Sequence, residues 1–389
     1  MNQLFDNIEN SFKHRSLKDL KKLRFIFKYL FSQRMVFWAK FFFKLAIRIH
    51  FPVKWIVKPT VFNYFCAGET LDEAAVTAEK LYRFKVQSIL DYAAEESANI
   101  QSAQHVLQQL IKVINFSSNK EFIAFTVFKP SALCKVEVLK KKSKGESLSD
   151  EEKKEYEFFL YCIDSLCSKA YENKIPILID AEYVSIQDVV DKVVFEMMLK
   201  YNKEKAIVYN TLQMYRKDRL QYLKNIYQIA ARENIYLGIK LVRGAYLEQE
   251  RIWAKQARQV SPVFDSKEET DNSYNAALRF CLENINRIAV FSGTHNEESN
   301  LKMIEWMQEL GIAKNDIRIF SSQLYGMSDH ITFNLAYEGY NVAKYIPFGE
   351  VKITIPYLLR RAEENKSIGN QISRELMLIN KAIQLRNKQ

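Results

Sequence analysis

Eight short apolar runs alternate with stretches of helical periodicity along this chain. The runs lie at residues 61–68, 122–128, 175–181, 206–210, 236–242, 288–293, 317–320 and 342–348. Between them, segments such as 188–202 and 299–311 place apolar side chains three or four residues apart, as on one face of a helix. Eight strand-then-helix units favour a closed (βα)8 barrel of the TIM type over an open sheet. The 389 residues, 48% of them hydrophobic, are enough for a core of that size.

Residues 1–58 have a different character and predict a basic, aromatic helical arm before the barrel. They hold 13 lysines and arginines and 3 acidic residues, so most of the net charge of +11 lies there. Charges interrupt every apolar run of the arm, and none reaches the roughly 18–20 residues that a membrane span requires. We expect the barrel to occupy 59–370 and a helical tail to occupy 371–389.

The arm leaves two structural interpretations open. Lys40, Lys44 and Arg48 recur every four residues with phenylalanines between them. Such a helix could lie in residues 20–58 on an anionic membrane surface, or it could pack its aromatic face on the barrel. The rest of the chain is nearly neutral, which argues against a nucleic-acid partner.

Two further patterns bear on location and on metal binding. Five cysteines without metal-site spacing, and no apparent signal peptide, favour a reducing, cytoplasmic compartment. The polar segment 139–161 is predicted to be a surface insertion in which Ser149 and Glu152 form a capping box. It lacks the ligand pattern of a calcium loop, and the sequence predicts no metal site.

Polar or aromatic residues follow each apolar run. In a barrel of this type the carboxyl ends of the strands meet at one rim, where chemistry collects. The last unit is followed by a helical stretch whose residues at i, i+3, i+4 and i+7 are aromatic or charged rather than apolar: Tyr357, Arg360, Arg361 and Glu364. Each signal alone is ambiguous, since an aspartate after a strand is often a helix cap and a charged stripe is often only solvated. The residues at this rim are Glu69, Lys129, Asp180, Glu182, Gln213, Lys240, Arg243, Tyr246, Thr294, His295, Asn296, Gln323, Tyr345, Tyr357, Arg360, Arg361 and Glu364.

Five motifs in this order resemble the proline dehydrogenase family. They are "IDAE" (179–182), "KLVRGAYLEQER" (240–251), "THN" (294–296), "QLYGM" (323–327) and "YLLRRAEEN" (357–365). The segments "FCAGET" (65–70) and "LVRGAYLEQER" (241–251) and the insertion before "IDAE" resemble the mitochondrial-type branch of that family. The resemblance runs from about residue 60 to 366. One departure is an exchange of charges, because many relatives have arginine where this chain has Lys240 and lysine where it has Arg243.

The resemblance implies a distorted (βα)8 barrel that holds FAD at the strand ends and oxidises L-proline to Δ1-pyrroline-5-carboxylate. Hydride would pass from substrate C5 to flavin N5, and electrons would then pass to a membrane quinone. Asp180, Lys129 and Lys240 are the implied catalytic residues. Glu69 and Arg360 would form a gate.

The resemblance also assigns the two binding sites. The implied substrate contacts are Lys129, Leu324, Tyr345, Tyr357, Arg360 and Arg361, with Asp180 as the expected charge partner of Lys129. The implied FAD contacts are Asp180, Gln213, Lys240, Val242, Arg243, Gly244, Ala245, Tyr246, Thr294, His295, Asn296 and Glu364.

Other functions compete with this interpretation. A 4-hydroxyproline dehydrogenase would need room at the substrate C4, which Tyr345 should crowd. Another flavin-dependent barrel reaction, such as folate reduction, would not need paired arginines on the last helix. A non-catalytic membrane-associated relative would not need to keep Lys129, Asp180 and both arginines.

Overall fold

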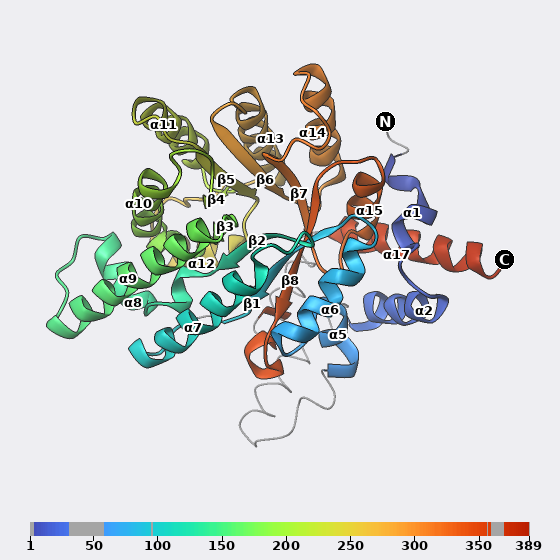
Figure 1. Ribbon diagram of the computed structural model, residues 1–389, viewed down its shortest axis with the longest axis horizontal. Helices are drawn as coiled ribbons and strands as arrows, with labels where there is room; N and C mark the ends of the chain where they lie inside the picture. Colours follow the sequence, from blue (N-terminus) through green and yellow to red (C-terminus); the bar gives the residue numbers. More distant parts are fainter. Residues whose placement is uncertain (1–3, 31–57, 95, 356, 359–368, 389) are drawn as a thin grey trace. The chain divides into compact units, whose positions relative to one another are not determined.

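The computed structural model describes residues 4–30, 58–94, 96–355, 357–358 and 369–388. Its eight strands form a closed parallel barrel in sequence order, which confirms the predicted (βα)8 architecture (Figure 1). The strands are β1 (Gln87–Tyr92), β2 (Ile123–Phe128), β3 (Ile177–Ile179), β4 (Val208–Gln213), β5 (Leu237–Val242), β6 (Ile288–Gly293), β7 (Ile319–Leu324) and β8 (Val342–Phe348).

By its contacts the chain divides into two compact units. The first comprises Met1–Ser88 and Gln323–Gln389, and the second comprises Ile89–Ser322. The predicted boundaries of arm, barrel and tail, at 58/59 and 370/371, remain predictions.

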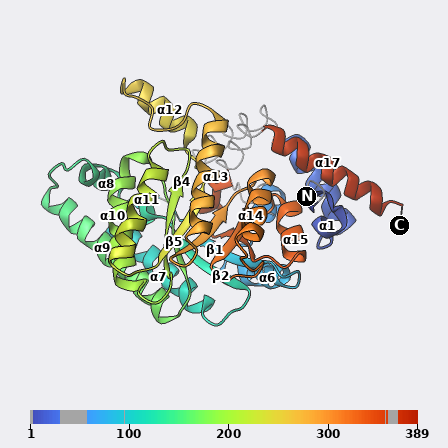
Figure 2. The ribbon, with the colours of Figure 1, turned by 90° about the horizontal axis from the view of Figure 1, so that it is seen from above.

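The second unit contains the helices that follow strands β1 to β6. They are α7 (Ile100–Ser117), η4 (Pro130–Ala132), α8 (Val136–Ser143), α9 (Asp150–Glu172), α10 (Val184–Tyr201), α11 (Arg219–Arg232), α12 (Leu247–Gln256), α13 (Lys267–Glu283) and α14 (Glu297–Glu309). Most of these helices lie outside the strands in Figure 1. In Figure 2, α12 lies instead beyond the end of β4.

Four aromatic rings fill the interior of the strands in the second unit. The ring centroid of Phe125 lies 5.3 Å from that of Tyr209, 5.1 Å from that of Phe291 and 5.0 Å from that of Phe320. Gly238 makes room for this layer, because a Cβ there would lie 2.6 Å from the Tyr209 ring. Successive side chains of a strand alternate between its faces. Residues two and four positions beyond this layer therefore point to the same interior, nearer the carboxyl ends of the strands.

The first unit contains both ends of the described chain and the last strand, β8. Its helices are η1 (Leu4–Asp6), α1 (Ile8–Phe12), α2 (Leu17–Phe25), η2 (Ile26–Leu30), η3 (Lys58–Phe62), α5 (Asn63–Phe65), α6 (Leu71–Tyr82), α15 (Asp329–Tyr337) and α17 (Gly369–Arg386). Leu20 and Leu23 of α2 share one buried apolar cluster with Leu378 and Ile379 of α17. The beginning of the predicted arm is therefore packed in a core, while residues 31–57, with Lys40, Lys44 and Arg48, lie outside the described residues.

The first predicted strand is wrong. Residues 61–68 are largely helical, in η3 and α5, and Phe62 and Phe65 are buried in the apolar cluster of the first unit. The first strand is instead β1, whose buried positions include Ser88 and Asp91. Because two of its buried side chains are polar, the sequence of β1 does not present a continuous apolar run.

The polar segment 139–161 is only partly the surface insertion that we expected. The capping box is confirmed, since Glu152 N donates to Ser149 Oγ at 3.2 Å and Ser149 N donates to Glu152 Oε2 at 2.9 Å. The helix that begins there is α9, which buries Phe159 and Ile163 and packs against α7 and α10. The second half of the segment is therefore the beginning of α9, which lies between β2 and β3 in the chain.

Candidate active site

Two lysine–aspartate ion pairs lie at the carboxyl ends of the strands in the second unit. Lys129 follows β2, and its Nζ lies 3.1 Å from Oδ1 and 3.0 Å from Oδ2 of Asp91 on β1. Lys240 of β5 places Nζ 2.5 Å from Oδ1 of Asp180, which follows β3. The structure pairs Lys129 with Asp91 and Asp180 with Lys240, and the expected contact between Lys129 and Asp180 stays a prediction. The barrel thus presents alternating charges from four strands.

The side chains of these two pairs are largely shielded from solvent. Asp91 is 0% exposed, and Lys129 is 8% exposed. The ammonium of Lys240 lies 5.9 Å from the centroid of the Phe291 ring, a member of the aromatic layer. A low local dielectric strengthens the attraction within each pair, and it also makes an unpaired charge there costly.

Gln213, the last residue of β4, places a hydrogen-bond acceptor in the interior of the strands. Its Nε2 donates to the carbonyl oxygen of Glu182 at 2.9 Å. Its Oε1 and the Oγ1 of Thr211 are buried and have no hydrogen-bond partner within the described part of the chain. Buried acceptors of this kind are normally satisfied. They therefore fit a bound group that carries hydrogen-bond donors, as the predicted flavin does.

Arg243, just after β5, is held by three side chains. It donates to Asp271 Oδ1 at 2.6 Å, Thr294 Oγ1 at 2.6 Å and Ser299 Oγ at 2.9 Å. Its guanidinium also lies 4.5 Å from the Tyr274 ring centroid. Burial raises the pKa of Asp271, but Lys267 and Arg243 lower it more, so that this pKa lies below its usual value. Arg243 therefore joins the loop after β5 to the loop after β6.

The loop after β5 needs glycine at position 244 for a reason within the protein. Gly244 has φ of +128°, and a Cβ there would lie 1.3 Å from the Tyr215 ring. The close approach that this glycine makes in the structure is thus to Tyr215. In the same loop, Val242 and Ala245 are partly buried, and Tyr246 is buried with its ring centroid 4.7 Å from that of Tyr183.

The "THN" motif forms the turn between β6 and α14. Thr294 Oγ1 accepts from Asn296 N at 3.1 Å in addition to Arg243. Asn296 caps α14 by accepting from Ser299 N at 2.9 Å. His295 lies between them and is partly buried. The motif's hydrogen bonds thus hold the turn at the carboxyl end of β6.

In the first unit, the predicted substrate contacts are largely buried. Tyr345 of β8 is 7% exposed and Tyr357 is 3% exposed. Tyr357 belongs to the apolar cluster, and Leu324 packs against it. The predicted contacts Arg360, Arg361 and Glu364 lie outside the described residues.

Glu69 does not follow a barrel strand, contrary to our expectation. It lies between α5 and α6 and forms an ion pair with Lys58. The gate of Glu69 and Arg360 was implied by the family resemblance; Arg360 lies outside the described residues, so the gate stays a prediction.

Sequence reasoning missed two buried charged residues near these sites. Asp91 was overlooked together with β1. Lys344 lies within the predicted strand 342–348, where it is 0% exposed and lies 3.0 Å from Asp329 Oδ1. A lysine in the middle of an apolar run, as in "VAKYIPF", was the available signal.

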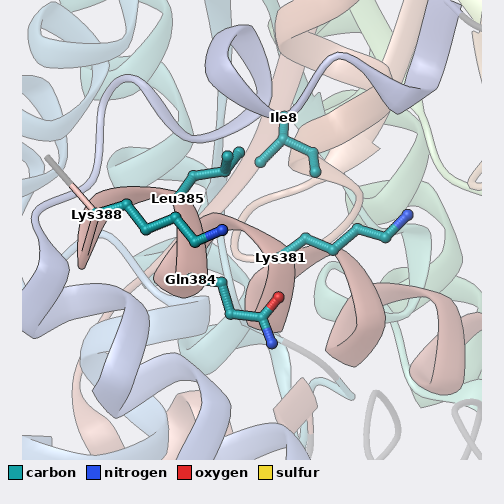
Figure 3. A pocket seen from close by; sticks show the side chains of 5 residues that line it. All are labelled: Ile8, Lys381, Gln384, Leu385 and Lys388. Carbon is teal, nitrogen blue, oxygen red and sulfur yellow. The ribbon is translucent and has the colours of Figure 1, made fainter.

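A surface pocket in the first unit is unrelated to the predicted site. It has a volume of about 190 Å³ and is lined by Ile8 of α1 and by Lys381, Gln384, Leu385 and Lys388 of α17 (Figure 3). None of these is a predicted site residue. Among the described residues, no cluster of three or more His, Cys, Asp or Glu side chains could hold a metal ion.

Comparison with known proteins places the chain in a family. The family model described as "Proline dehydrogenase" matches residues 74–374. The chain is 36% identical over 321 residues to the "Carbapenem antibiotics biosynthesis protein CarD" of Pectobacterium carotovorum, covering 82% of this chain and 83% of the relative. It is 33% identical over 356 residues to "Proline dehydrogenase 1, mitochondrial" of Arabidopsis thaliana, covering 80% and 71% of the two chains.

A solved structure has the same fold. The chain superposes on proline utilization A (PutA) of Bdellovibrio bacteriovorus with a TM-score of 0.70 at 22% identity, covering 78% of this chain and 32% of that one. The chain therefore spans about a third of the PutA protein. The fold, the matched motifs and the family model agree, and the chain belongs to the proline dehydrogenase family.

Proposed function

We propose that this protein oxidises L-proline to Δ1-pyrroline-5-carboxylate with a bound FAD. The observation that carries the proposal is the pair of buried lysine–aspartate ion pairs at the strand ends of a barrel from this family. Burying charges in a barrel interior costs desolvation free energy even when they are paired, and buried ionisable groups cluster at functional sites. Bound FAD would supply the hydride acceptor.

The charge balance of the described residues supports the predicted carboxylate clamp. Each of the two lysines is already opposed by an aspartate, so the four side chains together carry no net positive charge. We therefore assign recognition of the substrate carboxylate to Lys129 together with Arg360 and Arg361, whose planar guanidinium groups suit a bidentate contact.

The remaining residues would orient the two ligands. Leu324, Tyr345 and Tyr357 would exclude water from the pyrrolidine ring. Lys240 and Asp180 would lie beside the flavin. The Oε1 of Gln213, which has no hydrogen-bond partner among the described residues, would accept a hydrogen bond from it. The other assigned FAD contacts are Val242, Arg243, Gly244, Ala245, Tyr246, Thr294, His295, Asn296 and Glu364. For Glu69 and Arg360 to act as a gate, the ion pair of Glu69 with Lys58 would have to open.

We further propose that a membrane quinone accepts the electrons and that the protein docks on the inner face of the membrane from the cytoplasm. In the described residues, no helix is long and apolar enough to span a bilayer. The outer face of residues 17–30 supports surface contact. There Phe25 and Tyr29 are 54% and 48% exposed, among the exposed basic residues Lys18, Lys21, Lys22, Arg24 and Lys28. Five free, buried cysteines support a reducing compartment.

The decisive experiment is an absorbance spectrum of the purified protein. We expect a yellow protein whose flavin bands bleach under anaerobic conditions on addition of L-proline. Arg361→Met, at a predicted clamp position, should keep the flavin but raise the KM for proline strongly, because a charge-assisted contact to a buried carboxylate is lost, at a cost of roughly 2–5 kcal/mol. A colourless protein, or flavin that 4-hydroxyproline bleaches and proline does not, would contradict the proposal.

A further inference from the structure

We propose that Asp91 is a positioning residue for proline binding, which acts by holding the ammonium group of Lys129 at the barrel mouth. This inference rests on the proposed function. It concerns a residue that none of the recognised motifs contains, on a strand that the sequence did not reveal.

The geometry of the pair is specific. Both carboxylate oxygens of Asp91 lie within 3.0–3.1 Å of Lys129 Nζ, so the ammonium faces the carboxylate symmetrically. Asp91 lies within β1, whereas Lys129 is the first residue after β2. The rigid partner is therefore the aspartate, and the long lysine side chain is the part that is positioned.

Burial strengthens this contact between the ammonium group of Lys129 and the carboxylate of Asp91. The lysine side chain is 9% exposed and that of Asp91 is 0% exposed. Desolvation favours the neutral amine, whereas an adjacent carboxylate favours the ammonium form. A neutral or displaced Lys129 would lose its attraction for the substrate carboxylate.

The other charged pair at the strand ends, Lys240 with Asp180, is arranged differently. The other lysine at the strand ends, Lys240, is engaged by Asp180 at 2.5 Å. Lys129 and Asp91 are also adjacent in the barrel order, on β2 and β1, whereas Asp180 and Lys240 extend from β3 and β5. The two pairs thus extend from different strands of the barrel.

A double-mutant cycle tests the inference, with Asp91→Asn, Lys129→Met and the combined variant measured for proline oxidation. A charge-assisted contact contributes roughly 1.5–3 kcal/mol, so we expect Lys129→Met to raise KM by about tenfold to a hundredfold. Asp91→Asn should raise KM by about tenfold, with a smaller fall in kcat. In the Lys129→Met background, Asp91→Asn should change KM less than about twofold, because the side chain that it positions is gone.

Thermal unfolding of the same four proteins gives a readout that does not depend on activity. Asp91→Asn leaves a buried ammonium group without this carboxylate and should lower the Tm, and adding Lys129→Met should restore part of the loss. Asp164→Asn is the control, because it removes a carboxylate from an exposed ion pair with Lys200 on α9 and α10, away from the strand ends. That control should leave KM unchanged.

The possible outcomes separate the two proposals. If the parent protein does not oxidise proline, the proposed function fails and the inference fails with it. If the parent oxidises proline and Lys129→Met raises KM while Asp91→Asn does not, only the inference is overturned. KM effects that multiply in the combined variant would also overturn it, since they would show that Asp91 acts independently of Lys129.

Discussion

Asp329, the first residue of α15, is the centre of a buried ionic cluster in the first unit. Its Oδ2 accepts from Arg15 Nε at 2.9 Å and Nη2 at 2.8 Å, and it lies 3.2 Å from His14 Nε2. Its Oδ1 lies 3.0 Å from Lys344 Nζ. Burial raises the pKa of Asp329, but Arg15 and Lys344 hold it well below its usual range. The cluster thus joins the segment between α1 and α2 to α15 and β8.

The perturbation is Asp329→Asn, which keeps the shape of the side chain and removes its charge. Lys344 and Asp329 have side-chain exposures of 1% and 5%, so the two cations would be left without this counter-charge in a dry environment. Breaking a buried pair in this way costs about 3–5 kcal/mol. For a chain of this length the entropy of unfolding is on the order of 0.8 kcal/mol per kelvin, so the Tm should fall by about 5 °C.

The assay is thermal unfolding followed by circular dichroism at several pH values. Burial lowers the pKa of Lys344, and Asp329 opposes that shift. Without Asp329, Lys344 should lose its proton more readily, and a folded state that disfavours the charged lysine gains stability as pH rises. The deficit of the variant should therefore shrink as pH rises from neutral toward about pH 9.

At acidic pH, the stability difference between the parent and the variant changes with pH in the opposite direction. A carboxylate with a depressed folded-state pKa stabilises the protein above its unfolded-state value of 3.8, and this contribution is lost as pH falls through the folded-state pKa. The parent protein should therefore lose its advantage over Asp329→Asn below about pH 4. Glu172→Gln, which breaks an exposed helix pair with Lys169, is the control and should cost less than about 1 kcal/mol. An Asp329→Asn protein that melts within 1 °C of the parent would refute this account of the cluster.

Three other predictions follow from the geometry of the sites. Tyr345→Ser should increase kcat/KM for 4-hydroxyproline relative to proline, because it opens space beside the ring; an unchanged ratio in parallel assays would exclude the proposed pose. Gly244→Ala should lower the Tm and the flavin content, because its methyl group meets the Tyr215 ring, and Tyr215→Ser in the same protein should recover part of the loss in differential scanning fluorimetry. The cysteines should react with a thiol reagent at neutral pH only after unfolding, since burial raises the pKa of Cys162 to about 12 and also raises those of Cys134, Cys167 and Cys281; rapid labelling of the native protein would contradict this.

The sequence by itself determined the barrel and seven of its eight strands. Strands buried on both faces are nearly continuous apolar runs, and runs such as 288–293 and 342–348 coincide with β6 and β8. The family motifs also depend on local sequence alone, so they could be read directly. Lys129, Asp180, Gln213 and Lys240 lie at or near the carboxyl ends of strands, as the apolar runs before them predicted.

Only the tertiary structure decided which segment is β1 and which charges meet. Residues 61–68 are apolar enough for a strand, but their side chains fill a cluster made by α2 and α17, which come from the two ends of the chain. The pairing of Asp91 with Lys129 spans 38 residues, and that of Asp180 with Lys240 spans 60. The periodicity of the sequence indicates which face of an element is buried. Which charged residues pair with each other depends on the order and register of the strands, and these are set only when the barrel closes.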